Sequence, residues 1–420
     1  MPTTAIGDGH GIDPTESGVE RIATQAETGV RSINKAWFFA VLSFVIFGTQ
    51  NSVFMLPPIL VEITSDLETS VAVAGQLATA TFAAWAVSLI TAGPLSDSFG
   101  RRPVILAGLM LLVVSVIASA FAPNIEVFLA LRVLTGLAAG MLPPTSVGVL
   151  SDVISPERRA QAVSSFLAIG ILTSAVSVPL ALALADLRGW QFSFIVAGLI
   201  LAAGFAASWL WFPRDSRQRV RNWAFFSRYW NLVSLSFFQT AVAVGLSQRI
   251  AFWTMVSYFA AYLRDTYELS AGFAALPLGI VAVGQAAGSF FGGLVATNRH
   301  RALMMGATSA AGGACACLCF VVEMELWMAV SAATIGGSLL AVTMPALVAV
   351  STEHSGDSKS TGASIMGLSN QVGGAVGAAI AGALLASAGY GGIGYMCLGV
   401  TVASALLACL LRRNLRRGIG

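Results

Sequence analysis

Two arginines lie inside long apolar stretches of this chain, where a charged side chain is costly to place. Arg132 stands ~10 Å of helix rise below the nearer end of its stretch, and Arg249 stands ~21 Å of rise before Leu263. An arginine in such surroundings costs on the order of 2.5–3.5 kcal/mol on membrane-insertion scales. Its planar guanidinium donates paired hydrogen bonds to carboxylate and phosphate groups. These two residues could therefore bind an anionic or strongly polar group.

No acidic residue falls near the middle of an apolar stretch. Nine acidic residues lie instead at the ends of the stretches that we place on the outer side of the membrane: Glu62, Asp66, Glu68, Glu126, Asp186, Asp265, Glu268, Glu323 and Glu325. Two buried positive charges without a carboxylate favour an anionic or polar neutral ligand, because a cation would lack its counter-charge.

Further polar and aromatic residues lie at a similar depth. They are Gln248 beside Arg249, Trp253 one turn later, Gln50 and Asn51 in the first stretch, and Asn370 and Gln371 in the eleventh. Three other interpretations stay open. The amides can satisfy one another structurally, Arg132 can extend its guanidinium to the outer interface, and Arg249 can lie among cytoplasmic headgroups if its helix begins lower.

The composition predicts an all-α integral membrane protein. Hydrophobic residues make up 56% of the 420 positions and charged residues 10%, against about 25% charged in a soluble domain. Apolar runs of about 20 residues, long enough to cross a bilayer as a helix, occur at 36–60, 70–93, 103–122, 126–150, 163–185, 191–212, 231–263, 271–296, 302–322, 326–350, 361–388 and 392–411. The seventh run is too long for one upright helix. We interpret it as an interfacial segment followed by one tilted helix, which Gly245 could interrupt.

The distribution of lysine and arginine predicts the orientation. With both termini in the cytoplasm, only Arg188 and Arg264 fall outside, and the basic residues other than Arg132 and Arg249 lie on the cytoplasmic side. This is the positive-inside pattern of a multi-pass protein, here of the plasma (inner) membrane. The predicted parts are a disordered cytoplasmic tail (1–35), a first six-helix bundle (36–213), a cytoplasmic linker (214–230), a second bundle (231–411) and a basic cytoplasmic tail (412–420).

The loop between the second and third runs combines glycines with charges. It reads Gly93-Pro94-Leu95-Ser96-Asp97-Ser98-Phe99-Gly100-Arg101-Arg102-Pro103, and we interpret it as a short hinge in which Gly100 permits positive φ. The pattern G-x-L-x-D-x-x-G-R-[RK] resembles the signature loop of the major facilitator superfamily of transporters. Arg132, Gly136 and Gly140 resemble that superfamily's R-x-x-x-G-x-x-x-G pattern in the fourth helix.

The resemblance implies twelve transmembrane helices in two six-helix bundles related by a pseudo-two-fold axis. It implies a substrate-binding or proton-coupling role for Arg132. The implied gating residues, whose charge contacts break during inward opening, are Gly93, Asp97, Gly100, Arg101, Arg102 and Asp152. Gly136 and Gly140, on one helix face, are expected to permit close helix packing. Pro179 is also expected to have a role in helix packing.

The chain departs from the superfamily patterns in two places. In the second half, Gly292, Gly293 and Leu294 match the loop but Thr297 replaces the acid, so this loop is expected to lack the full set of latching charges. The fifth run keeps Pro179 but lacks the glycine-rich pattern of antiporters, which weakens an antiport assignment. Gly189-Trp190-Gln191-Phe192 resembles the start of the sixth helix in drug and metabolite exporters, and it is equally an ordinary interfacial anchor.

We therefore expect a secondary transporter working by alternating access, a proton-coupled efflux permease for a drug or metabolite, with an anionic or polar neutral substrate favoured. A facilitator or symporter importing a small organic anion is the alternative. A membrane enzyme would need a group of catalytic residues within the spans, but His10, His300 and His354 lie in the tail or loops. A transport-inactive receptor would be expected to carry a soluble signalling domain as well, and the predicted parts of this sequence include none.

The remaining expectations concern partners. The five cysteines lie in apolar runs away from histidine, which predicts neither a metal site nor a disulfide framework. We expect a monomer in the lipid bilayer whose partners are a small-molecule substrate and protons. Neither a cofactor nor a nucleic-acid partner is expected, since the net charge of +3 follows the membrane topology.

Overall fold

The computed structural model describes residues 35–154, 156–212, 224–355 and 359–417, and the regular structure in these ranges is helical. Residues 1–34 of the predicted tail and 214–223 of the predicted linker lie outside the described part of the chain. Within it, α10 covers the last residues of the predicted linker, and α15 continues to Arg417, inside the predicted basic tail.

The first half contains the helices up to α9. Their bounds are α2 (Lys35–Phe54), η1 (Pro57–Ile59), α3 (Leu60–Asp66), α4 (Val71–Ala74), α5 (Gln76–Phe99), α6 (Arg101–Ser119), α7 (Ile125–Val153), α8 (Pro156–Arg188) and α9 (Trp190–Trp211). The first predicted run is interrupted at Pro57 and Pro58, because proline lacks the N–H that a continuous helix needs. The chain then stays helical to Asp66, beyond the predicted limit of 60.

The second half begins with the short helix α10. Its helices are α10 (Ala224–Val233), α11 (Ser236–Tyr267), α12 (Ala271–Ala296), α13 (Arg301–Val321), α14 (Leu326–Glu353) and α15 (Lys359–Arg417). The seventh predicted run begins within the last residues of α10, and α11 begins at Ser236, so the interfacial location predicted for the start of this run stays a prediction. The predicted interruption at Gly245 is wrong, because α11 runs through it, with Gly245 close to Leu347 and Ser369. α15 changes direction at Gly389, whose φ of 64° favours glycine.

The helices are long and apolar enough for a membrane protein. In the described ranges, nine helical segments meet both the length and the hydropathy expected of a membrane span, and one of them, Thr361–Leu415, is 55 residues long. Gly389 divides that segment in two. With α8 and α11, which are 33 and 32 residues long, the twelve predicted spans are accounted for.

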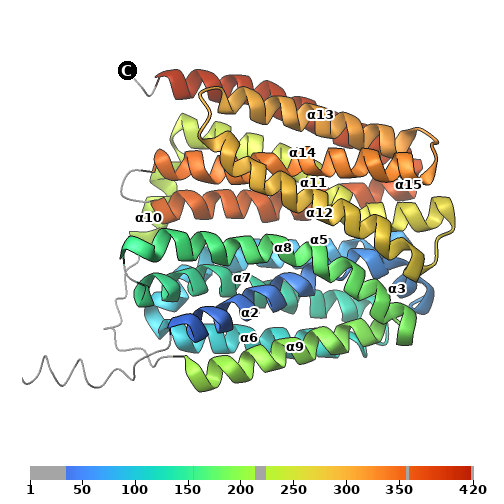
Figure 1. Ribbon diagram of the computed structural model, residues 1–420, viewed down its shortest axis with the longest axis horizontal. Coiled ribbons are helices and arrows are strands. Elements are labelled where there is room, and N and C mark those ends of the chain that lie inside the picture. The colour runs from blue at the N-terminus through green and yellow to red at the C-terminus, as the bar shows by residue number, and fades with distance from the viewer. Residues whose placement is uncertain (1–34, 155, 213–223, 356–358, 418–420) are drawn as a thin grey trace, which may run out of the picture.

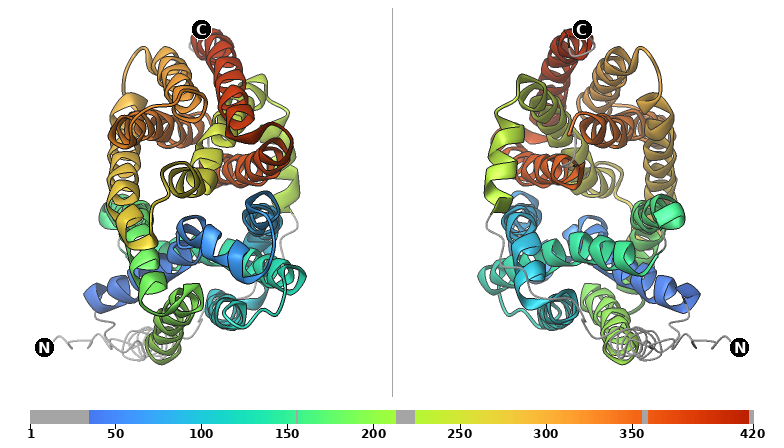
Figure 2. Two further views of the ribbon diagram at one scale, coloured as in Figure 1. Left: turned by 90° about the vertical axis from the view of Figure 1, so that its right-hand side faces the viewer. Right: turned by 90° about the vertical axis from the view of Figure 1, so that its left-hand side faces the viewer.

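Figure 1 shows the helices running roughly side by side, and Figure 2 shows the first half (blue to green) stacked against the second half (yellow to red). Between the halves, α8 packs against α12 and α5 against α15. We call the end that carries Asp66, Gly189 and Gly389 the outer end, after the predicted topology, and the end that carries Gly100 the inner end.

The hinge predicted at 93–103 is shorter in the structure. α5 continues through Gly93 to Phe99, and α6 begins at Arg101, so Gly100 alone makes the turn. Its φ is 93° and its ψ is 155°, a conformation that a side chain would strain.

Candidate functional site

Arg132 is fully buried in the first half, and its guanidinium points into the protein. Its exposed fraction is 0%. Nη1 donates to the carbonyl oxygen of Ser52 at 3.3 Å, and Nη2 donates to Oγ of Ser119 at 2.9 Å. The structure therefore contradicts the alternative in which Arg132 extends to the outer interface.

Aromatic rings surround the Arg132 guanidinium. Its Cζ lies 5.5 Å from the ring centroid of Phe128 and 5.1 Å from that of Phe194, within the range of a cation–π interaction. Trp190 stacks on Phe128 with centroids 5.6 Å apart. Nε1 of Trp190 in turn donates to Oδ2 of Asp66 at 2.9 Å. The Gly189–Phe192 segment thus contributes to the packing beneath Arg132, a role that the sequence pattern did not indicate.

Arg249 is buried in the second half, with 5% of its surface exposed. Nε donates to Oε1 of Gln248 at 2.8 Å, and Nη2 donates to the carbonyl oxygen of Leu340 in α14 at 3.0 Å. Nε2 of Gln248 donates to the same carbonyl, and Cζ of Arg249 lies 4.2 Å from the Phe252 ring centroid. These contacts contradict the alternative that places Arg249 among headgroups.

Trp253 connects the two halves. Its ring stacks against Phe54 of α2 with centroids 5.8 Å apart and lies 4.5 Å from the Phe82 ring of α5. Nε1 of Trp253 donates to Oδ1 of Asn370 in α15 at 3.2 Å. Trp253 and Asn370, both selected from the sequence, are therefore in direct contact. Trp253 also lines a small cavity with Arg132.

The other candidate amides are less closely connected. Asn51 and Gln371 are buried, with 3% and 7% of their surface exposed, and Gln50 lies near Gly170 of α8. Oε1 of Gln371 is buried and accepts no hydrogen bond in the described structure. In the described ranges, the hydrogen bonds of Arg132 and Arg249 go to other residues and not to these three amides.

The gating residues are only partly described. The surroundings of Gly93 and the side chains of Asp97 and Asp152 fall outside the described structure, so the charge contacts predicted for the two acids stay a prediction. The Arg101 guanidinium lies against Gly148 of α7. Nη2 of Arg102 donates to the carbonyl oxygen of Trp209 at 2.7 Å.

Gly136 and Gly140 of α7 lie against α5. A Cβ on Gly136 would collide with the carbonyl oxygen of Thr81, and one on Gly140 would lie 2.6 Å from Cβ of Ser88. Close approach of these two helices therefore requires glycine at both positions. Pro179 lies within α8, where it removes one backbone donor.

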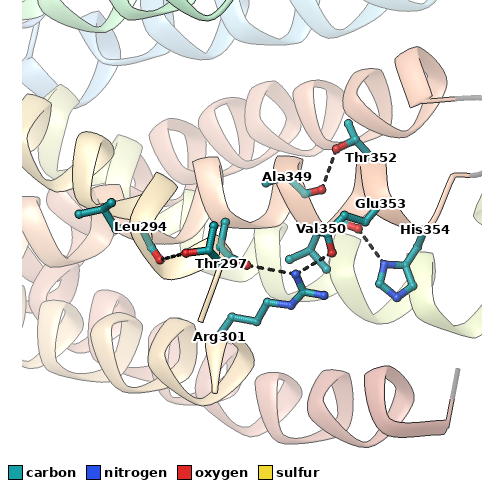
Figure 3. A network of polar contacts seen from close by, with 9 residues as sticks. Leu294, Thr297, Arg301, Ala349, Val350, Thr352, Glu353 and His354 are labelled. Carbon is teal, nitrogen blue, oxygen red and sulfur yellow. Dashed lines mark hydrogen bonds and ion pairs between the residues drawn. The ribbon is translucent and has the colours of Figure 1, made fainter. Parts of the chain in front are cut away.

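The start of α13, just after the loop that follows α12, carries an ion pair that we did not predict from the sequence. Nη1 of Arg301 donates to Oε2 of Glu353 at 2.6 Å and to the carbonyl oxygen of Ala296 at 3.1 Å (Figure 3). Oγ1 of Thr297 donates to the carbonyl oxygen of Leu294 at 2.9 Å. Glu353 stands at the end of α14, so its proximity to Arg301 had no local sequence signal.

A second missed contact lies at the outer end. Nη1 of Arg264 and Oε1 of Glu62 are 2.5 Å apart and join α11 to α3 across the two halves. The sequence placed both charges at the outer edge but gave no indication of their pairing. Nearby, the Tyr258 hydroxyl donates to the carbonyl oxygen of Ala378 at 2.9 Å and lies against Gly75.

The chain belongs to the Major Facilitator Superfamily, whose family model matches residues 42–252 and again 241–419. The family predicted from the signature loop is therefore confirmed, as is the all-α fold of two bundles. The chain is an integral membrane protein of a family of transporters.

Individual relatives are distant. A gentisate transporter of Corynebacterium glutamicum is 27% identical over 43% of this chain and 40% of its own length. A chloramphenicol resistance protein of Pseudomonas aeruginosa is 33% identical over 30% of this chain and 31% of its own length. The chain thus matches less than half the length of these curated relatives.

The fold is also similar to that of solved transporters. A bacterial homologue of the human lysosomal transporter Spinster, in an inward-facing and occupied conformation, superposes with a TM-score of 0.71. The superposition covers 89% of this chain and 95% of the other, at 17% sequence identity. At this identity the likeness supports the fold alone.

Proposed function

We propose that this protein exports a small organic anion or polar neutral molecule by alternating access, coupled to protons. The observation that carries the substrate class is the pair of buried arginines, Arg132 and Arg249, for which the described residues offer neutral partners only. A cationic substrate would meet two positive charges at this depth, whereas an anionic group would reduce their desolvation cost.

The contacts between the halves support a position for the substrate between them. Trp253 joins both halves, and Arg132 reaches the same cavity from the first half. The Glu62–Arg264 pair closes the outer end. These contacts support a state that is closed outward, from which the substrate would be taken up at the inner end.

Proton coupling requires a group that titrates during the cycle. No acidic residue lies near the middle of a predicted span. The acids of the outer edge as a group, or the substrate's own ionisation, would therefore have to carry the proton.

A second candidate is the import of an organic anion. It is supported by the resemblance to the gentisate transporter, because gentisate is an organic anion, whereas the resemblance to the chloramphenicol resistance protein supports export. In both cases we expect a monomer in the inner membrane with both termini in the cytoplasm.

Transport by the purified protein in liposomes distinguishes these proposals. Counterflow of labelled solutes across a panel of anions, neutral molecules and cations tests the substrate class. An imposed pH gradient of either sign then tests coupling and direction. Transport restricted to cations would refute the proposed substrate class, and rates independent of the gradient would refute proton coupling.

A further inference from the structure

A small cavity lies between the two halves near the outer end. Its lining includes Ser52, Thr81 and Arg132 from the first half and Trp253 and Ser257 from the second. Its volume is about 10 Å³. A cavity of this size has room for one particle of about the size of a water molecule.

The cavity has an uncompensated positive charge in its wall. Arg132 is 0% exposed, and its contacts in the described structure are neutral: a carbonyl oxygen, a hydroxyl group and two aromatic rings. Arginine keeps its proton in proteins. A buried charge with neutral partners carries a large desolvation cost, which a counter-ion at this position would reduce.

Two hydrogen-bond donors of the cavity wall have no partner. They are Nε of Arg132 and the hydroxyl of Ser257, which is 3% exposed. The other lining donors already have acceptors: Oγ1 of Thr81 donates to Leu77 at 2.8 Å, Oγ of Ser52 donates to Thr49 at 2.7 Å, and Nε1 of Trp253 donates to Asn370. A ligand that binds to these two donors must therefore be a hydrogen-bond acceptor.

We infer that this cavity binds a single chloride ion, held by Arg132 from the first half and Ser257 from the second. A water molecule would fill the space but would leave the charge uncompensated. The body of an organic anion does not fit in a cavity of about 10 Å³. Chloride is larger than water, so the cavity walls must move apart slightly to admit it, and the unpartnered Ser257 hydroxyl can turn its hydrogen toward the ion.

The site depends on the arrangement of the halves. Because its two donors belong to opposite halves, the site is complete only while the outer end is closed, and bound chloride stabilises that arrangement. The proposed function assigns Arg132 to the substrate, so chloride and a substrate anion would compete for the same guanidinium. Chloride binding is measured below without any substrate, so its result is separate from the transport result that tests the proposed function.

The test measures thermal unfolding of the purified full chain in detergent while sodium gluconate is replaced by sodium chloride at constant ionic strength. We expect a saturable rise in the unfolding midpoint, on the order of 3 °C, and bromide should reproduce it. Ser257→Ala should raise the half-saturating chloride concentration about fivefold, because one of the two donors is lost.

The matched control is Ser208→Ala. Ser208 of α9 is also buried with an unpartnered hydroxyl, but it does not line the cavity. This variant should keep the wild-type chloride response. A wild-type midpoint that does not change with chloride would overturn the inference, and so would equal responses of the two serine variants.

A second measurement keeps the inference testable if Ser257→Ala does not fold. Crystals of the unmodified protein grown in sodium bromide should give an anomalous peak within hydrogen-bonding distance of Arg132 and Ser257. The same data, if they show the outer end closed and no such peak, would overturn the inference.

Discussion

Glu62 and Arg264 form an ion pair that holds the two halves together at the outer end. Oε1 of Glu62 lies 2.5 Å from Nη1 of Arg264, and the two side chains are 19% and 12% exposed. Charges enclosed to this degree are screened less by salt than charges on the surface. Since α3 and α11 belong to different halves, opening of the outer end must break this pair.

Glu62→Gln should therefore favour the outer-open state by about 1 kcal/mol, a shift of roughly fivefold in the equilibrium. The measurement is the rate at which an external, membrane-impermeant thiol reagent labels a cysteine placed at Ala78 in a cysteine-free background. Ala78 is buried and lines the cavity between the halves, so it should react faster when the outer end opens. Glu353→Gln breaks an ion pair within the second half and is the control. Equal labelling of both variants would contradict the prediction.

Arg249→Ala should raise the apparent substrate constant about tenfold or more, if this guanidinium binds a substrate anion. Arg249→Lys should restore part of the affinity, because it keeps the charge but loses the planar pair of donors that now reach Gln248 and Leu340. Transport kinetics in liposomes measure both. Arg188→Ala, which removes an exposed arginine at the outer end, is the control. Normal transport by Arg249→Ala would refute the substrate role.

Trp253→Ala should reduce transport more than Trp253→Phe. Phenylalanine keeps an aromatic ring between Phe54 and Phe82 but loses the hydrogen bond to Asn370. We expect the alanine variant to lose roughly tenfold or more in transport rate and the phenylalanine variant a few-fold. Trp327→Ala, at a half-exposed position on α14, should transport normally. Identical losses in all three variants would indicate a general folding defect.

Gly136→Val should lower the thermal unfolding midpoint by several degrees, because its side chain would push α7 away from the Thr81 carbonyl. Gly293→Ala is the matched control, since a Cβ there meets nothing within 4 Å. This substitution should leave the midpoint unchanged or raise it slightly, as alanine is the better helix former. A stable Gly136→Val protein would show that α5 and α7 can move apart without cost.

Cysteines at Ser216 and Asp186 test the predicted topology. In a cysteine-free background, the first should react only with reagents that reach the cytoplasm and the second only with external reagents. The opposite pattern would reverse the sides assigned to the outer and inner ends. Equal reactivity with an external reagent would show that the membranes leak, which a soluble marker trapped inside the same vesicles detects.

Much of the fold follows from apolar length, because a chain in lipid must satisfy its backbone hydrogen bonds within helices. The predicted run 271–296 coincides with α12, and Gly100 makes the predicted turn. Gly245 shows the limit of local reasoning. A glycine inside a helix is a weak signal for interruption when neighbouring helices pack against it.

The site was predictable as a set of residues but not as a set of contacts. The apolar surroundings of Arg132 and Arg249 predict their burial. The acceptor for Arg249 is the backbone carbonyl of Leu340, and this contact could not be predicted because every residue has a backbone carbonyl. The contacts of Trp253 with Phe54 and Phe82 depend on the docking of the two halves. Sequence spacing carries no information about that docking.

The Arg301–Glu353 pair has a consequence for how the molecule responds to salt. It joins α13 to α14 within the second half (Figure 3), so a rotation of one half relative to the other would not separate the two partners. In the proposed cycle, added salt should then weaken this pair equally in each state and leave the relative populations of the states unchanged. Ionic strength would act instead through charges whose partners separate, such as Glu62 and Arg264.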